Sequence, residues 1–170
     1  MMMIDLDADA IYRALAQRVR EATAGREVRL VGVHTGGVWI AEKLKVELGV
    51  TAPVGVLDVS FYRDDFARSG LKPDVRPSRI DFEVAGGHLI LVDDVLFTGR
   101  TVRAAMNELF DYGRPARIDL AVLIDRGGRE LPIAPTFVGR TIELPRDVTV
   151  ELVRDAEQRL HLKLEQKPSA

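Results

Sequence analysis

One stretch of the chain, residues 89–101, constrains the fold more than any other. It opens with four apolar residues in a row, Leu-Ile-Leu-Val, which predict a strand buried on both faces. Two adjacent carboxylates, Asp93 and Asp94, stand at the end of that strand. A turn rich in threonine and glycine follows at residues 98–101, and a helical pattern begins at residue 102. Buried strands rarely end in two carboxylates, because each charge needs a partner or water.

The turn and the carboxylates together predict a ligand of mixed chemistry. A helix start rich in Thr and Gly offers unpaired backbone N–H groups, which bind phosphate. Carboxylates repel a phosphate, but they suit sugar hydroxyls and a magnesium ion. A phosphorylated ribose carries a phosphate at one end and a pair of hydroxyls at the other. The alternative interpretation is a buried parallel strand followed by an ordinary turn.

The rest of the chain alternates helices with strands. The apolar spacing predicts an amphipathic helix at 4–22, strands at 28–33, 53–59 and 117–124, and helices from about 38 to 48 and from 102 to near 112. Such alternation produces right-handed crossovers and a parallel sheet flanked by helices. From residue 137 to about 165 the apolar residues alternate as in hairpin or edge strands, predicting a small hood.

Four polar segments follow predicted strands and are expected to meet at one edge of the sheet, where parallel sheets bind ligands. They are residues 34–37, 60–65, 93–101 and 125–130. The long polar stretch at about 60–80 is predicted to be a flexible lid, since structureless loops of that length are usually functional or disordered. Arg63 in that stretch is a suitable diphosphate partner. A solvated arginine among acidic neighbours is the equal alternative.

Two further segments are candidate ligand sites. Residues 34–37, His-Thr-Gly-Gly, are a second phosphate candidate, because consecutive glycines allow positive φ and let N–H groups approach an anion. A plain turn is the alternative. Phe137 could cover a planar base, and the backbone of Val138 could recognise its polar edge. The alternative is that Phe137 belongs to the core.

The thirteen-residue motif resembles the phosphoribosyl-pyrophosphate signature of type I phosphoribosyltransferases. The resemblance implies that fold, with a lid and a hood, and a catalytic role for Asp93 and Asp94 at the ribose hydroxyls, with Mg2+ held nearby, mainly through the substrate. It implies that the 5-phosphate is bound by Val95, Leu96, Phe97, Thr98, Gly99, Arg100 and Thr101. It implies that pyrophosphate is bound by His34, Thr35, Gly36, Gly37 and Arg63. The family often has basic residues at the positions of His34 and Gly36.

A closer resemblance covers nearly the whole chain. Segments 62–65, 92–104, 113–115, 120–127 and 129–133 are similar to the bifunctional pyrimidine-operon attenuation regulators and uracil phosphoribosyltransferases. The resemblance implies uracil and phosphoribosyl pyrophosphate as substrates, UMP as product, and a homodimer or higher oligomer. It implies base binding by Asp125, Arg126, Phe137 and Val138. Gly128 stands where that family commonly has histidine.

The same resemblance implies binding of a pyrimidine-operon leader RNA. Candidate contacts are Arg13, Arg20, Arg26 and Arg29, although acidic residues alternate with them and a solvated surface is the simpler interpretation. The alternatives for the function as a whole are an RNA-binding attenuator with vestigial catalysis and a phosphoribosyltransferase for another nucleobase.

Composition limits the other classes of function. The chain has 170 residues and reads as a single domain, 1–170, without cysteine and with three scattered histidines. Thiolate metal sites and a cysteine nucleophile are therefore excluded. The net charge of −2 gives no overall basic field. Neither a basic signal-peptide start nor an apolar run of membrane-spanning length is present, so we expect a cytoplasmic protein without membrane contact.

Overall fold

The computed structural model describes residues 6–59 and 78–168, and its central element is a five-stranded sheet. The strand order is β2-β1-β3-β4-β5, and every pairing is parallel. The strands are β1 (Arg29–Val33), β2 (Gly55–Leu57), β3 (His88–Leu96), β4 (Arg117–Asp125) and β5 (Phe137–Thr141). The predicted α/β class with a parallel sheet is confirmed.

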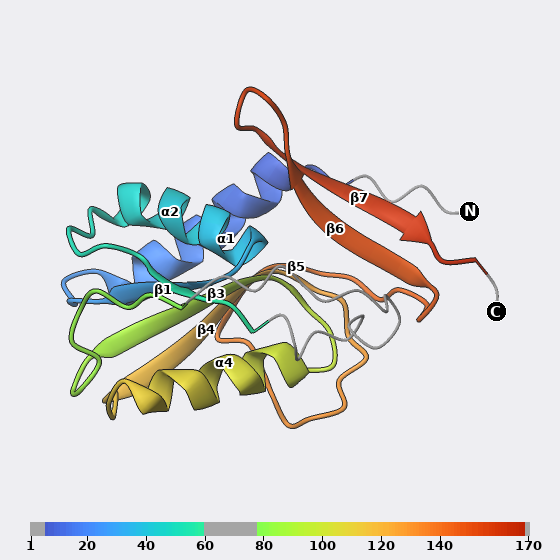
Figure 1. The fold of residues 1–170 in the computed structure, drawn as a ribbon. Coiled ribbons are helices and arrows are strands. Elements are labelled where there is room, and N and C mark those ends of the chain that lie inside the picture. The colour runs from blue at the N-terminus through green and yellow to red at the C-terminus, as the bar shows by residue number, and fades with distance from the viewer. Residues whose placement is uncertain (1–5, 60–77, 169–170) are drawn as a thin grey trace.

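Helices cover both faces of this sheet (Figure 1). α1 (Ala8–Thr23) and α2 (Gly36–Leu48) lie on one face, and α4 (Arg100–Asp111) lies on the other. α1 begins at Ala8 rather than at the predicted residue 4, because the Asp7 carboxylate accepts a hydrogen bond from the N–H of Ala10 at 3.1 Å and caps the helix. α2 ends at Gly49, which adopts the left-handed conformation (φ 66°).

Each face of the sheet has its own apolar core. The α1 and α2 side is built around side chains such as Leu15, Ile40 and Leu123, and the α4 side around Leu91 and Leu109, all fully buried. Strand side chains alternate between the two cores, which is why β3 and β4 consist of nearly continuous apolar runs.

The C-terminal segment forms a separate antiparallel hairpin of β6 (Val148–Arg154) and β7 (Leu160–Gln166). The predicted hood thus exists, but it is shorter than the predicted 137–165. β5 belongs instead to the main sheet, where Phe137 pairs with Ala121 of β4. Figure 1 shows the hairpin above the sheet, beside the end of α2 that carries its first turn.

Several predicted boundaries are wrong by a few residues. β3 runs to Leu96, because its pairing with β4 continues to Leu96 and Asp125, so the two carboxylates lie inside the strand. β2 is shorter than the predicted 53–59. Residues 60–77, with Arg63 and most of the predicted lid, lie outside the described residues. Among the described helices, none is long and apolar enough to cross a membrane.

Candidate active site

The two carboxylates of β3 are held in place by the backbone that follows them. Asp93 is 6% exposed, and its Oδ1 accepts a hydrogen bond from the N–H of Asp94 at 2.8 Å. Oδ1 of Asp94 in turn accepts from the N–H of Val95 at 2.8 Å. Each carboxylate thus has one oxygen bonded by the backbone N–H that directly follows it.

The first turn of α2 packs directly against these carboxylates. A Cβ added to Gly36 would lie 2.4 Å from Oδ2 of Asp94, and one added to Gly37 would lie 2.3 Å from the carbonyl oxygen of Val92. Neither glycine has a positive φ, so that part of the prediction for the Gly-Gly pair is wrong. At Gly37 the helix approaches the β3 backbone too closely for any side chain, whereas at Gly36 the close contact is with the Asp94 side chain.

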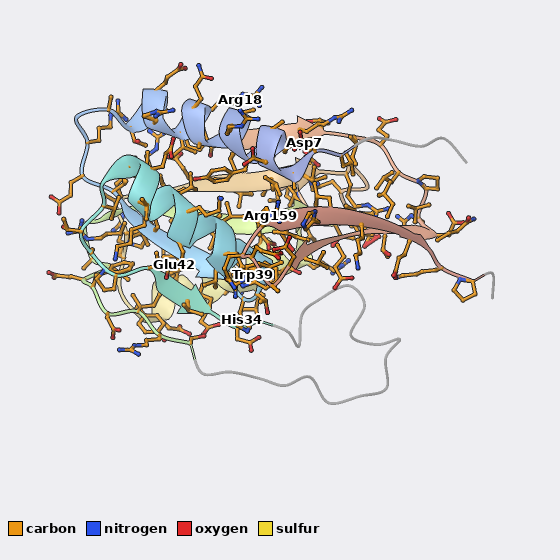
Figure 2. The ribbon with its side chains drawn as sticks, turned by 90° about the horizontal axis from the view of Figure 1, so that it is seen from above. Asp7, Arg18, His34, Trp39, Glu42 and Arg159 are labelled. Carbon is orange, nitrogen blue, oxygen red and sulfur yellow. The ribbon has the colours of Figure 1, made fainter. Side chains whose placement is uncertain are left out.

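That approach brings two predicted ligand segments together. Thr35 caps α2 without a side-chain hydrogen bond, and the His34–Thr35 peptide is cis. The exposed backbone N–H groups of a helix start attract anions. In Figure 2, His34 and Trp39 lie at this end of α2, with Glu42 further along it.

The turn after β3 forms a second helix start at the same sheet edge. Gly99 caps α4 with φ 96°, a conformation that favours glycine. The hydroxyl of Thr98 accepts from the N–H of Arg100 at 3.2 Å. Within the described part of the chain, no group accepts from the N–H groups of Thr101 and Val102. These N–H groups form the expected anion cradle.

The other predicted members of the phosphate segment pack rather than point outward. Leu96 is 1% exposed and its carbonyl accepts from the N–H of Arg126 at 3.1 Å. Val95 packs against the core on the α1 and α2 side. The ring of Phe97 lies 4.0 Å below the guanidinium of Arg126. These three residues position the turn through their side chains.

The loop between β4 and β5 folds back onto that turn. The N–H groups of Glu130 and Leu131 both donate to the carbonyl of Thr98, at 2.9 and 3.1 Å. Arg129 bonds the carboxylate of Asp125 through Nη2, at 2.7 and 2.9 Å. The predicted base-binding carboxylate is thus already paired, a feature that sequence reasoning missed.

Arg126, also predicted to bind the base, is directed to the hood. It is 4% exposed, and its guanidinium donates to the carbonyls of Val148 at 2.6 Å and Pro145 at 2.9 Å. These hydrogen bonds connect the end of β4 to the start of the β6–β7 hairpin. Nothing in the local sequence distinguishes such an arginine from a ligand-binding one.

The two remaining candidates for base binding, Phe137 and Val138, have different surroundings. Phe137 is 9% exposed and belongs to the core beneath α1, as the alternative interpretation held. Val138 lies level with Asp93, since both pair with Val122. The carbonyl of Val138 accepts from the guanidinium of Arg18 on α1. The structure therefore brings the backbone of Val138, but not the ring of Phe137, to the level of the carboxylates.

The four candidate RNA contacts lie on α1, in the turn after it and at the start of β1. Arg13 and Arg20 are on the exposed side of α1, paired with Asp9 and Glu47 at 3.3 Å in each case. Arg29 opens β1, at the end of the strand opposite the edge that carries the carboxylates, and pairs with Glu27. Arg26 is exposed in the turn between α1 and β1.

Comparison with known proteins agrees with this geometry. Residues 5–158 match the model of the phosphoribosyl transferase domain. The chain is 60% identical to "Bifunctional protein PyrR" of Pseudomonas aeruginosa over 136 residues, 80% of each chain. It is 51% identical to the protein of the same name from Nitrosococcus oceani over 154 residues, 88% of this chain and 87% of that one.

Solved structures agree on the fold. A hypoxanthine phosphoribosyltransferase from Staphylococcus aureus superposes with a TM-score of 0.66 at 17% identity, covering 87% of this chain and 80% of that chain. A purine phosphoribosyltransferase from Pyrococcus horikoshii has a TM-score of 0.60 at 28% identity, covering 79% and 81%.

Proposed function

Because this chain belongs to the phosphoribosyltransferase family and has its type I fold, we propose that it transfers a ribosyl 5-phosphate from phosphoribosyl pyrophosphate to uracil. The products are UMP and pyrophosphate. One observation carries the proposal: the start of α2 packs against Asp94, and α4 begins at Arg100, directly after the end of β3 at the same sheet edge. Two helix starts near two carboxylates match a ribose that bears a phosphate and a diphosphate.

Each part of the substrate has its own group of residues. The N–H groups around Thr98 to Thr101 bind the 5-phosphate, and the first turn of α2, with His34 and Thr35, binds the diphosphate. Asp93 and Asp94 accept from the ribose hydroxyls. Their charge favours the positive anomeric carbon that forms as pyrophosphate leaves. Arg63, which we assign to the diphosphate from the sequence alone, completes this set.

Magnesium fits the site through oxygen ligands. The carboxylate oxygens of Asp93 and Asp94 are the hard donors that Mg2+ prefers. In residues 6–59 and 78–168, no group of three His, Asp or Glu side chains could hold a metal ion. We therefore assign most of the ligands to the diphosphate and ribose oxygens of the substrate. Bound there, the ion neutralises the charge of the leaving diphosphate.

Pyrophosphate release measured with a panel of nucleobases tests the proposal. We expect release with uracil at a kcat/KM well above that with hypoxanthine, guanine, adenine or orotate. A preference for another base would support the phosphoribosyltransferase activity but reject uracil as its substrate. If no base causes release, the remaining alternative is an RNA-binding attenuator with vestigial catalysis.

A second function, binding of a pyrimidine-operon leader RNA, is favoured by the name of the relatives, which are called bifunctional. The proposed contacts are Arg13, Arg20, Arg26 and Arg29. The ion pairs of Arg13 and Arg20 are solvent-exposed, and exposed pairs contribute only about 0–1 kcal/mol. RNA phosphates can therefore replace those carboxylates. We also propose a homodimer or higher oligomer, which sedimentation of the free protein tests.

A further inference from the structure

One guanidinium connects three segments around the proposed site. Besides pairing with Asp125, Arg129 donates through Nη1 to the carbonyl of Phe97 at 2.6 Å and through Nε to the carbonyl of Ile133 at 2.8 Å. The side chain of Arg129 is 23% exposed and that of Asp125 is 13% exposed. The Asp125 carboxylate also accepts from the N–H of Gly127 at 3.0 Å. Four hydrogen bonds thus hold the Arg129 side chain in one arrangement.

We propose that Arg129 is a positioning residue that holds the acceptor loop, residues 126–136, in register with the phosphate turn. This inference rests on the proposed function, and it places the uracil beside this loop because the loop lies between the predicted base-binding residues Arg126 and Val138. Asp125 then acts as the counter-ion of Arg129 and does not contact the base. Both oxygens of its carboxylate are engaged by the guanidinium, and a paired carboxylate is a poor partner for a neutral base.

The loop depends on this contact more than the turn does. Residues 126–136 contain no helix or strand, whereas the phosphate turn is fixed by β3 on one side and α4 on the other. Where the two segments touch, a Cβ added to Gly128 would lie 2.4 Å from the Phe97 ring. A small shift of the loop would therefore change the base site and leave the anion cradle in place.

Replacing Arg129 with glutamine tests the proposal directly. In Arg129→Gln we expect kcat/KM for uracil to fall by about 10- to 100-fold, as misplacement of a substrate by roughly 1 Å does. The affinity for ribose 5-phosphate, which needs only the cradle, should stay within about threefold. Arg146→Gln is the matched control, because Arg146 contacts the same loop only through an exposed pair with Glu130 at 3.3 Å. Equal losses for uracil and ribose 5-phosphate would overturn the proposal, as would unchanged kinetics.

A double-mutant cycle with Asp125→Asn separates the two possible roles of Asp125. If Asp125 acts only through Arg129, the double variant should lose no more uracil efficiency than the worse single variant. If Asp125 contacts the base itself, the two losses should multiply, and the proposal is wrong. Should Arg129→Gln fail to fold, Asp125→Asn alone must still show the selective loss for uracil.

Hydrogen exchange of the free protein provides a test without substrate. In Arg129→Gln, amides of residues 126–136 should exchange at least about tenfold faster, while those of α4 and β4 should not change. Unchanged exchange in the loop would reject the positioning role even if uracil transfer is found. If the wild-type protein does not use uracil but the loop does loosen, the proposed substrate is wrong and the positioning role remains.

Discussion

Gly36 and Gly37 are neighbours in the sequence, yet they face different atoms. A Cβ at Gly36 would meet the carboxylate end of Asp94, a side chain that can rotate away. A Cβ at Gly37 would meet the backbone at Val92 and Asp93, which is fixed in the centre of the sheet. The two substitutions should therefore have opposite consequences for activity and stability.

We predict that Gly36→Ala lowers turnover by about 10- to 100-fold, because it displaces a carboxylate from the developing cation. Its free energy of unfolding should change by less than about 1 kcal/mol, since alanine favours a helix. Gly37→Ala should lower the free energy of unfolding by about 1–3 kcal/mol through overpacking. Urea unfolding and steady-state kinetics on both variants check this, and a stability loss in Gly36→Ala as large as in Gly37→Ala would contradict it.

The carboxylates themselves provide the second prediction at this scale. Asparagine in place of Asp93 or Asp94 keeps the shape of the side chain and removes its charge. We expect kcat to fall by about 10- to 1000-fold in each variant, in line with the loss of one electrostatic contact to a transition state. Steady-state assays decide this, and wild-type turnover in both variants would reject the assignment to the ribose.

At the scale of elements, apolar periodicity predicted which helices and strands exist, but it did not predict the residues at which they end. The buried runs of β1, β3 and β4 and the amphipathic pattern of α1 needed only local apolar spacing. The end of β3 was missed because it depends on pairing with β4, a contact that local sequence does not contain. For the same reason β5 was assigned to the hood: alternation predicts a strand, and only tertiary contacts decide which sheet it joins.

The same limit applies to the site. The carboxylates and the Thr-Gly turn were predictable because their chemistry is unusual at the end of a buried strand. The partners of Asp125 and Arg126 were not, because an arginine that binds backbone carbonyls looks the same in sequence as one that binds a ligand. For Phe137 the sequence left two roles open, covering a base or packing in the core, and only its burial beneath α1 in the fold shows that it packs in the core.

The amino ends of β3 and β4 carry a charged cluster whose pH dependence can be predicted. Nε2 of His88 lies 2.6 Å from the carboxylate of Asp119, and Nε of Arg117 donates to it at 3.1 Å. Burial raises the pKa of Asp119, but the hydrogen bonds from His88 and Arg117 outweigh it, and the pKa lies below its ordinary value. A folded pKa below the unfolded one means that ionised Asp119 stabilises the fold.

This stabilisation is complete above the unfolded pKa of about 4 and is lost as the pH falls through the lowered folded pKa. We predict that Asp119→Asn lowers the free energy of unfolding by about 1–3 kcal/mol at neutral pH, as expected for hydrogen bonds to a charged group. The difference from wild type should shrink between about pH 5 and pH 2. Urea titrations across this range measure it, and a difference that stays constant would show that the charge of Asp119 is irrelevant.

For the molecule as a whole, we expect Mg2+ to bind together with the substrate rather than to the protein alone. If Mg2+ is held mainly through the diphosphate, millimolar Mg2+ alone should leave the Tm unchanged, because the metal has too few protein ligands. Phosphoribosyl pyrophosphate with Mg2+ should raise the Tm further than it does with EDTA, since only bound ligand stabilises the native state. Thermal melts under the four conditions test this. A rise with Mg2+ alone would indicate a site built by the protein.

Arg26 and Arg29 of the proposed RNA surface lie at the start of β1, opposite the sheet edge that carries the proposed site, which allows the two activities to be separated. Arginines that bind phosphates release counterions, so affinity for a leader hairpin should fall steeply as salt rises. We predict that replacing Arg20 and Arg26 with Gln weakens this binding and reduces the salt slope by about 1 for each lost contact. Replacement of Arg159, in the turn between β6 and β7, should do neither.

Coupling between the RNA surface and the proposed site can be measured from both binding equilibria. If UMP in the proposed site tightens RNA binding, RNA must tighten UMP binding by the same factor, because the coupling free energy is shared. Uracil transfer by the Arg20 and Arg26 variant should remain at the wild-type rate, since neither residue contacts the sheet edge that holds the substrate. Titrations of RNA with and without UMP, and the reverse, measure both factors. Equal affinity of the wild-type protein for leader and unrelated RNA at physiological salt would reject the regulatory function and leave the transferase alone.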